Sequence, residues 1–356
     1  MFARDRCHTT QRSFFFKLNA KYNPALFWFA VLTAVMTFLL IGLGGLVTSN
    51  NFGMSVPDWP TSYGYNMFAL PIKFWKGGVF YEHTHRLLAS VIGFLTTILA
   101  VWLWLKDSRK WVHWLGVATF LAVVVQGALG GLRVVLTDAQ LGIFHGALAQ
   151  LFLVLVCAIA LFTSRWWQNS AAEKQVSVPR GLRSHVLYVT ILIFIQLMIG
   201  ATMRHQHAGL AIPDFPLAYG KIWPDTSPEA VAAYNEHRME MNGENPITAF
   251  QIILQMVHRL VALLILLGVI ATAFLARKKL DGRDWLTKFA WFWTGLIVVQ
   301  IALGIATIET NKAADIATLH VMVGALSLLA GVLWWLVAAR RTTLTEFAPA
   351  GQNELN

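Results

Sequence analysis

Long apolar stretches separated by short polar segments follow one another along almost the whole chain. Eight of them reach the length of about 20 residues that an α-helix needs to cross the hydrocarbon core of a bilayer. Their approximate limits are residues 25–48, 79–105, 111–132, 140–163, 186–203, 249–275, 289–308 and 316–338. The pattern predicts an all-α integral membrane protein with eight transmembrane helices.

The balance of residue types agrees with this prediction. The chain has 356 residues, of which 56% are hydrophobic and only 13% are charged. A soluble domain has about 25% charged residues, so much of this surface must face something other than water. The two cysteines, Cys7 and Cys157, are too far apart for a Cys-x-x-Cys zinc site or a covalent haem attachment.

The basic residues are distributed unevenly between alternate connections. If the N-terminus is cytoplasmic, nineteen Lys and Arg residues fall in inner segments and seven in outer segments. This asymmetry predicts that both termini are cytoplasmic, and it explains the net charge of +10 without a nucleic-acid partner. Residues 1–24 lack the apolar core of a cleaved signal and are short for a mitochondrial transit peptide, so we expect a bacterial inner membrane.

The second half of the chain repeats motifs of the first half in the same order. GGLVTSNNFGMSVPDWPTSYG at 44–64 aligns without a gap with GATMRHQHAGLAIPDFPLAYG at 200–220. EHTHRLLA at 82–89 matches QMVHRLVA at 255–262, QGALG at 126–130 matches QIALG at 300–304, and His145 matches His320. Four matches in one order indicate a duplication.

The duplication predicts how the helices are organised. Because each repeat has four helices, an even number, the repeats should be parallel and related by an axis along the membrane normal. We predict a cytoplasmic tail (1–24), an N-terminal four-helix-bundle half (25–165), a cytoplasmic linker (166–185), a C-terminal four-helix-bundle half (186–340) and a cytoplasmic tail (341–356).

The first outer loop of each repeat is rich in Pro, Gly and aromatic residues, which include Trp59, Tyr63, Tyr65, Phe68, Phe215, Tyr219 and Trp223. This composition is typical of an interfacial aromatic belt; a lid over a site that opens outward is the alternative. The neighbouring glycines Gly44, Gly45, Gly127, Gly130 and Gly131 are typical of close helix packing.

Four of the eleven histidines lie near the outer ends of the even-numbered helices, one on each: His85, His145, His258 and His320. Ionisable side chains within spans are costly and normally face the bundle interior. A single histidine there would most often make an interhelical hydrogen bond. Four at matched depth favour two bis-histidine haem sites, with His85 opposite His145 and His258 opposite His320. His205 and His207, in an outer loop, are a weaker candidate for a metal pair.

Other polar residues accompany the predicted haem ligands. Arg86 and Arg259 directly follow two of the histidines and are predicted to contact haem propionates, with snorkelling to the interface as the alternative. Glu82 lies three residues before His85, on the same helical face, where the second half has Gln255. A carboxyl near the end of a helix can simply be solvated, but beside a haem-binding histidine it predicts a group that handles protons or stabilises a cationic intermediate.

These residues resemble the haem A synthase family. The resemblance rests on EHTHR at 82–86, on one histidine in each even-numbered helix, and on Gly53 with PDWP at 57–60 in the first outer loop. It covers about residues 25–340. It implies an oxidoreductase that converts the position-eight methyl of haem O to a formyl group through a hydroxymethyl stage, for biogenesis of haem-copper terminal oxidases.

The resemblance also implies roles for the two halves. His258 and His320 would be the axial ligands of a resident haem b, whereas His85 and His145 would bind the iron of the substrate haem beside the catalytic Glu82. Some members carry a cysteine pair in the first outer loop, but this loop has none, with Ser62 near the expected position. A thiol step is therefore not expected here.

Two other functions fit parts of the pattern. A membrane diheme b-type electron-transfer protein needs the histidine pairs but not Glu82, and a transporter needs the repeats but no haem. For a synthase, the expected partners are haem O, haem O synthase, an electron-transfer protein, the lipid bilayer and a second copy of the chain, with no nucleic acid. The haem sites should lie toward the outer face of the membrane.

Overall fold

The computed structural model describes residues 22–169, 177–242 and 246–346, and these residues are predominantly helical. The helices are α1 (Pro24–Ser49), α2 (Gly77–Lys106), α3 (Lys110–Leu136), α4 (Ala139–Thr163), α5 (Arg165–Asn169), α6 (Arg180–His205), α7 (Pro228–Asn242), α8 (Ala249–Leu280), α9 (Trp285–Glu309) and α10 (Ala314–Glu346). In the same ranges the only β features are two isolated bridges in the outer loops. The predicted all-α class is confirmed.

Among the described residues, eight helices, all except α5 and α7, are long and apolar enough to cross a membrane. They fall on the eight apolar stretches predicted from the sequence. The largest extensions beyond these stretches are in three helices: α6 begins at Arg180, inside the predicted linker, α8 continues to Leu280, and α10 continues to Glu346. Hydropathy marks the membrane-crossing part of a helix, and polar residues can continue the helix beyond it. Cys7 and most of the two predicted tails lie outside the described residues.

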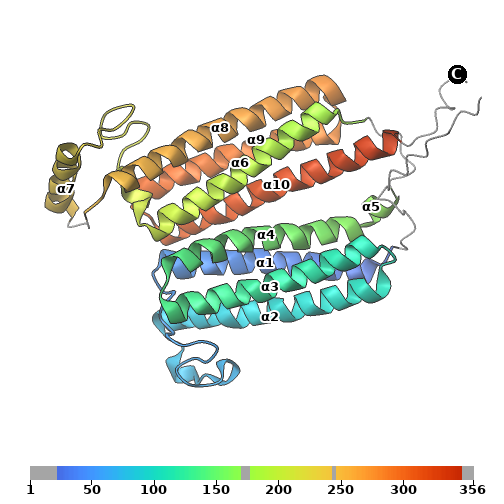
Figure 1. Ribbon diagram of the computed structural model, residues 1–356, viewed down its shortest axis with the longest axis horizontal. Helices are drawn as coiled ribbons and strands as arrows, with labels where there is room; N and C mark the ends of the chain where they lie inside the picture. Colours follow the sequence, from blue (N-terminus) through green and yellow to red (C-terminus); the bar gives the residue numbers. More distant parts are fainter. Residues whose placement is uncertain (1–21, 170–176, 243–245, 347–356) are drawn as a thin grey trace, which may run out of the picture.

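The eight long helices lie in two groups of four (Figure 1). In the first group α1 and α3 each contact both α2 and α4; in the second, α6 and α9 each contact both α8 and α10. The groups meet where α1 contacts α10 and where α4 contacts α6 and α10. Short connections, such as residues 107–109, make consecutive helices antiparallel. As a result α2, α4, α8 and α10 all begin at the same end, on the left in Figure 1.

Local capping specifies where several spanning helices begin. The side chain of Asn23 accepts a hydrogen bond at the start of α1, and Pro24 occupies its first position. Asp138 caps α4 in the same way, and Thr248 and Gln251 form a capping box at the start of α8. These caps satisfy backbone N–H groups that have no partner within the helix.

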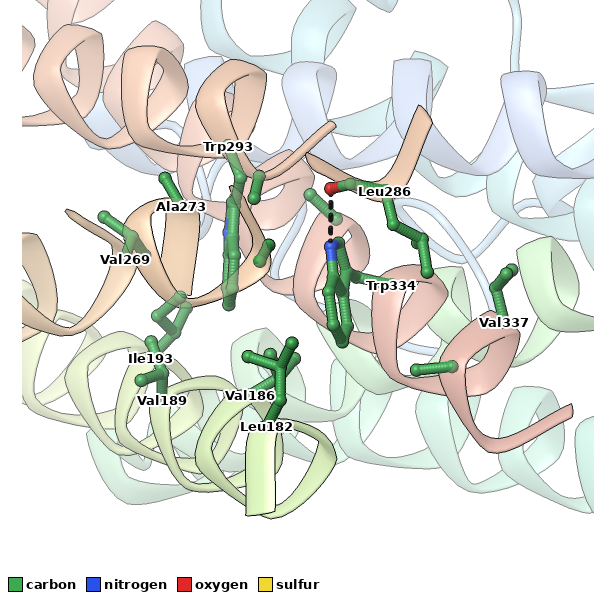
Figure 2. Close-up of a cluster of buried hydrophobic side chains, with 14 of the residues drawn as sticks. Leu182, Val186, Val189, Ile193, Val269, Ala273, Leu286, Trp293, Trp334 and Val337 are labelled. Carbon is green, nitrogen blue, oxygen red and sulfur yellow. Dashed lines mark hydrogen bonds between the residues drawn. The ribbon is translucent and has the colours of Figure 1, made fainter. Parts of the chain in front are cut away.

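The second group is packed tightly around two tryptophans (Figure 2). Trp293 and Trp334 are fully buried, and their indole N–H groups donate to the carbonyls of Ser327 (2.9 Å) and Leu286 (3.0 Å). The surrounding aliphatic side chains include Leu182, Val186, Val189, Ile193, Val269 and Val337. Trp334 lies some 20 Å along α10 from His320, at about 1.5 Å per residue. This core is therefore far from the level of the histidines.

The loops after α1 and α6 contain the same turn. In each loop an aspartate side chain accepts hydrogen bonds of 2.7–2.9 Å from two consecutive backbone N–H groups; the sets are Asp58 with Tyr63 and Gly64, and Asp214 with Tyr219 and Gly220. The backbone φ angles at these donors lie between 52° and 75°, a region that glycine adopts readily. Burial raises the pKa of the Asp58 carboxyl, but hydrogen bonds from Gly64, Thr61 and Tyr63 outweigh it and leave the pKa below its ordinary value.

The longer outer loop of the second half contains α7, which the hydropathy pattern did not predict. The ring of Tyr234 on α7 stacks on Tyr219 at 3.7 Å between ring centres. Asn235 pairs with the backbone N–H and carbonyl of Ile247, and Arg238 donates to the carbonyl of Leu210 (2.8 Å). The inserted helix is thus held against the loop that precedes α8.

Candidate functional site

The structure places the four predicted ligands in corresponding positions. His85, His145, His258 and His320 lie in the first three turns of α2, α4, α8 and α10, the helices that begin at the same end (Figure 1). All four side chains are half-buried. The rings of His258 and His320 are 6.4 Å apart between centres, with their planes inclined by 56°. His85 and His145 lie within electrostatic range of each other.

The spacing of the C-terminal pair fits ligation of one iron by two imidazoles. Metal–imidazole nitrogen bonds are about 2 Å long, so two rings bound on opposite sides of one metal have centres roughly 6 Å apart. The observed 6.4 Å between His258 and His320 agrees with this value. The site therefore has the donor type and the spacing that a bis-histidine haem requires.

Hydrogen bonds fix the protonation of two of the imidazoles. Nδ1 of His145 lies 3.1 Å from the carbonyl oxygen of Gln126, and Nδ1 of His320 lies 3.0 Å from that of Gln300. A carbonyl can only accept, so Nδ1 must carry the hydrogen in both rings. Nε2 is then the nitrogen that carries the lone pair, which is the form that binds a metal. In His320 this nitrogen lies 3.4 Å from the side-chain amide nitrogen of Gln300, which donates to it. Gln126 and Gln300 occupy matching positions in the two repeats of sequence.

The other two imidazoles share a different feature. Nδ1 of His85 and Nδ1 of His258 are buried and have no hydrogen-bond partner within the described parts of the chain. A buried polar atom without a partner is costly. The unpartnered nitrogen occurs at matching positions in both halves. This agrees with two sites in which the imidazole rings bind a ligand.

Each of the four imidazoles packs against a glycine of a neighbouring helix. The pairs are His85 with Gly44, His145 with Gly130, His258 with Gly200 and His320 with Gly304. A β-carbon added to the glycine would lie 2.9 Å from the ring in both N-terminal pairs, and 3.4 and 3.2 Å from it in the C-terminal pairs. In the N-terminal half, any side chain at these positions would have to displace the imidazole.

These contacts extend the sequence interpretation of the glycines. Gly45 and Gly131 do allow close packing, against Thr318 and Trp59. Gly44 and Gly130 instead make room for a histidine ring. The signal was present in the duplication, because both glycines recur at the matching positions of the second half.

Glu82 and Gln255 hold the loops that follow α1 and α6. Both side chains are buried. Glu82 accepts a hydrogen bond from the backbone N–H of Val56 (2.9 Å) and forms an ion pair with Arg86 (2.7 Å). Gln255 accepts from the backbone N–H of Ile212 (2.7 Å). The two positions therefore share a structural task and differ in charge.

The arginines beside the ligands have partners that the sequence did not predict. Arg86 donates to the carbonyls of Val56 (2.7 Å) and Asp58 (2.6 Å), and Arg259 donates to those of Asp214 (2.8 Å) and Leu217 (2.9 Å). Both guanidiniums therefore fasten the loop that precedes their helix. Contact with haem propionates stays a prediction.

Three histidines outside the pairs have local surroundings of their own. His83 is fully buried, with its ring edge against Trp75 and Nδ1 3.4 Å from the hydroxyl of Ser62. The ring of His205 lies against Gly142, and His207 has a left-handed backbone. The part of the chain that the structure describes contains no group of three or more His, Cys, Asp or Glu suited to a metal ion, and a site at His205 and His207 alone stays untested.

Comparison with known proteins decides the family. A family model described as cytochrome oxidase assembly protein, COX15-CtaA, matches residues 27–332. The chain belongs to this family. It is 26% identical over 315 residues to the haem A synthase of Shouchella clausii, covering 86% of this chain and 94% of that protein. It is also 28% identical over 318 residues to the haem A synthase of Geobacillus kaustophilus, covering 87% and 90%.

Proposed function

We propose that this COX15-CtaA family member is a haem A synthase, which oxidises the position-eight methyl group of haem O to a formyl group through a hydroxymethyl stage. The relatives named haem A synthase align over 90% or more of their own length in the two cases above. The observation that carries the proposal is the pair His258 and His320, at the spacing of two imidazoles on one iron, together with matched histidines in the first half.

The C-terminal half is assigned the resident haem b, with His258 and His320 as axial ligands. When bound, this group supplies one-electron transfer. The residues contribute orientation: Gln300 holds His320 through the Nδ1 hydrogen bond, and Gln196 donates to the backbone carbonyl of His258 (2.9 Å). Arg259 keeps the outer loop closed over this end of the half.

The N-terminal half is assigned the substrate haem O, with His85 and His145 as ligands to its iron. Glu82 is the catalytic candidate because it places a carboxylate where the other half has the neutral Gln255. Its ion pair with Arg86 keeps the carboxylate fixed one turn from His85. In this position it can hold or receive a proton as the methyl group is oxidised.

The membrane arrangement completes the proposal. The two groups of helices are parallel repeats, both termini are cytoplasmic, and the histidine pairs lie toward the outer face of a bacterial inner membrane. Support comes from the basic residues concentrated in alternate connections. The start of α1 and the end of α10 also lie at the same end of the helices, opposite the histidines (Figure 1). Haem O would come from haem O synthase, with an electron-transfer protein as a second partner.

The decisive experiment identifies the pigments chemically. The protein is expressed in a host that makes haem O but has no haem A synthase, and extracted haems are separated by chromatography. Haem A in the extract supports the proposal. Haem b bound to the protein without any haem A would identify a diheme electron carrier instead, and a preparation without a Soret band would favour the transporter.

A further inference from the structure

Arg133 lies beside the N-terminal histidine pair but takes no part in fastening the loop. It is in the last turn of α3, three residues after Gly130, so both lie on the face of α3 that contacts His145. Its guanidinium lies against Gly53 of the first outer loop, 3.0 Å from where a β-carbon would be. Within residues 22–169, 177–242 and 246–346 it makes no hydrogen bond or ion pair.

A second arginine reaches the same region from the other half of the chain. Nη2 of Arg204, in the last turn of α6, donates to the carbonyl of Gly45 (2.8 Å) and to the hydroxyl of Ser49 (2.5 Å) on α1. Gly45 directly follows Gly44, the glycine that contacts His85. The C-terminal half therefore contributes a cation to the edge of the N-terminal site.

A lysine extends this group of positive charges. Lys312 lies in the connection between α9 and α10 and is half-buried. Burial and the nearby charge of Arg204 lower the pKa of the Lys312 ammonium below its ordinary value. Arg133 and Arg204 also lie within electrostatic range of each other. We call Arg133, Arg204 and Lys312 the cationic cluster.

Like charges gathered in partly buried positions repel one another unless an anion balances them. Arg133 lies in electrostatic range of the carboxylate of Glu82, which already forms an ion pair with Arg86. The cationic cluster therefore carries a net positive charge. Guanidinium groups pair well with carboxylates because they offer two parallel N–H donors.

We propose that the cationic cluster binds the propionate carboxylates of the porphyrin held by His85 and His145, with Arg133 as the principal contact. This inference rests on the proposed function, since it requires a porphyrin at the N-terminal pair. It also explains an asymmetry of the repeats. The positions that match Arg133 and Arg204 are occupied by Thr307 and Thr48, so the cluster serves the N-terminal site and is assembled from both halves.

The test compares a porphyrin that has free carboxylates with one that lacks them. Purified full-length protein carrying its resident haem is titrated with iron protoporphyrin IX and, in parallel, with the dimethyl ester, and uptake is followed by the Soret difference spectrum. Wild-type protein should bind the free acid at least about tenfold more tightly than the ester, because the ester has no negative charge and cannot form a bidentate ion pair with a guanidinium. Arg133→Gln should lose most of this preference, and Arg133→Lys should keep part of it.

Matched controls separate the cluster from the fold and from the proposed function. Arg283→Gln removes an exposed cation between α8 and α9 and should keep the wild-type preference. The resident haem spectrum in each variant checks that the protein is folded. If Arg133→Gln still prefers the free acid as strongly as wild type does, the proposal is wrong. If wild-type protein takes up neither porphyrin, the N-terminal haem site itself is wrong, and the proposed function fails with it.

Discussion

Glu82 and Gln255 occupy matching positions in the two halves and make the same hydrogen bond to a loop backbone. Glu82 accepts from the N–H of Val56 (2.9 Å) and Gln255 from that of Ile212 (2.7 Å). An amide oxygen is therefore sufficient to hold such a loop. Any activity that depends on the carboxylate of Glu82 must come from its charge, which also pairs with Arg86, or from its proton, and not from the hydrogen bond to Val56.

This relationship gives a prediction in which two variants of one residue are compared. Glu82→Gln keeps an acceptor for Val56 but removes the carboxylate, whereas Glu82→Ala removes both. We expect haem A formation to fall about a hundredfold in both variants, the range of general acid–base catalysis, while the resident haem is retained. Haem A is measured by chromatography and the resident haem by its Soret band. Normal activity in Glu82→Gln with loss only in Glu82→Ala would reduce Glu82 to a loop anchor.

The glycine contacts predict that a single methyl group can disturb the N-terminal site. In Gly130→Ala the added β-carbon would lie 2.9 Å from the His145 ring, so the ring must move. Because metal ligation depends on ligand orientation, iron protoporphyrin IX should bind at least about tenfold more weakly. Gly127→Ala on the same helix is the matched control, because its β-carbon would meet nothing within 4 Å. Titration of both variants followed by absorbance measures the difference. Equal affinities would show that His145 tolerates the displacement.

Much of the membrane architecture could be predicted from the sequence because the signals are local. Each span is a continuous apolar stretch, and the duplication aligns His85 with His258 and His145 with His320. The helices and the closeness of His258 to His320 follow these signals. The assignment of haem ligands and of Glu82 stays a prediction.

The loop contacts were not predictable in the same way. Arg86 was expected at a propionate, but its donors reach the carbonyls of Val56 and Asp58. That result depends on the path of a loop some thirty residues away in sequence, which neither hydropathy nor helical spacing describes. The helix α7 was missed because a short polar helix carries no hydropathy signal. Arg133 and Arg204 come together only through packing between the two halves.

The turn around Asp58 predicts how the first outer loop responds to acid. Its folded pKa lies below the ordinary value, so the ionised form stabilises the loop. That stabilisation is fully present above the unfolded pKa of about 4, and it is lost as the pH falls through the lower folded pKa. At neutral pH, Asp58→Asn should be cleaved by chymotrypsin near the exposed Phe68 faster than wild type is. Resistance equal to wild type would mean that the turn does not depend on the charge.

The two histidine pairs should fail differently when a ligand is removed, because one pair is assigned a resident cofactor and the other an exchangeable substrate. His258→Ala or His320→Ala leaves a single imidazole where two lie 6.4 Å apart, so the purified protein should lose most of its Soret absorbance. His85→Ala or His145→Ala should keep that absorbance but make less than a tenth of the wild-type haem A, since one of two iron ligands is lost. Spectra of the purified variants and chromatography of the extracted haems provide both measurements. Loss of the same haem from all four variants would contradict separate roles for the two halves. Full retention of haem and product in all four variants would exclude these histidines as ligands.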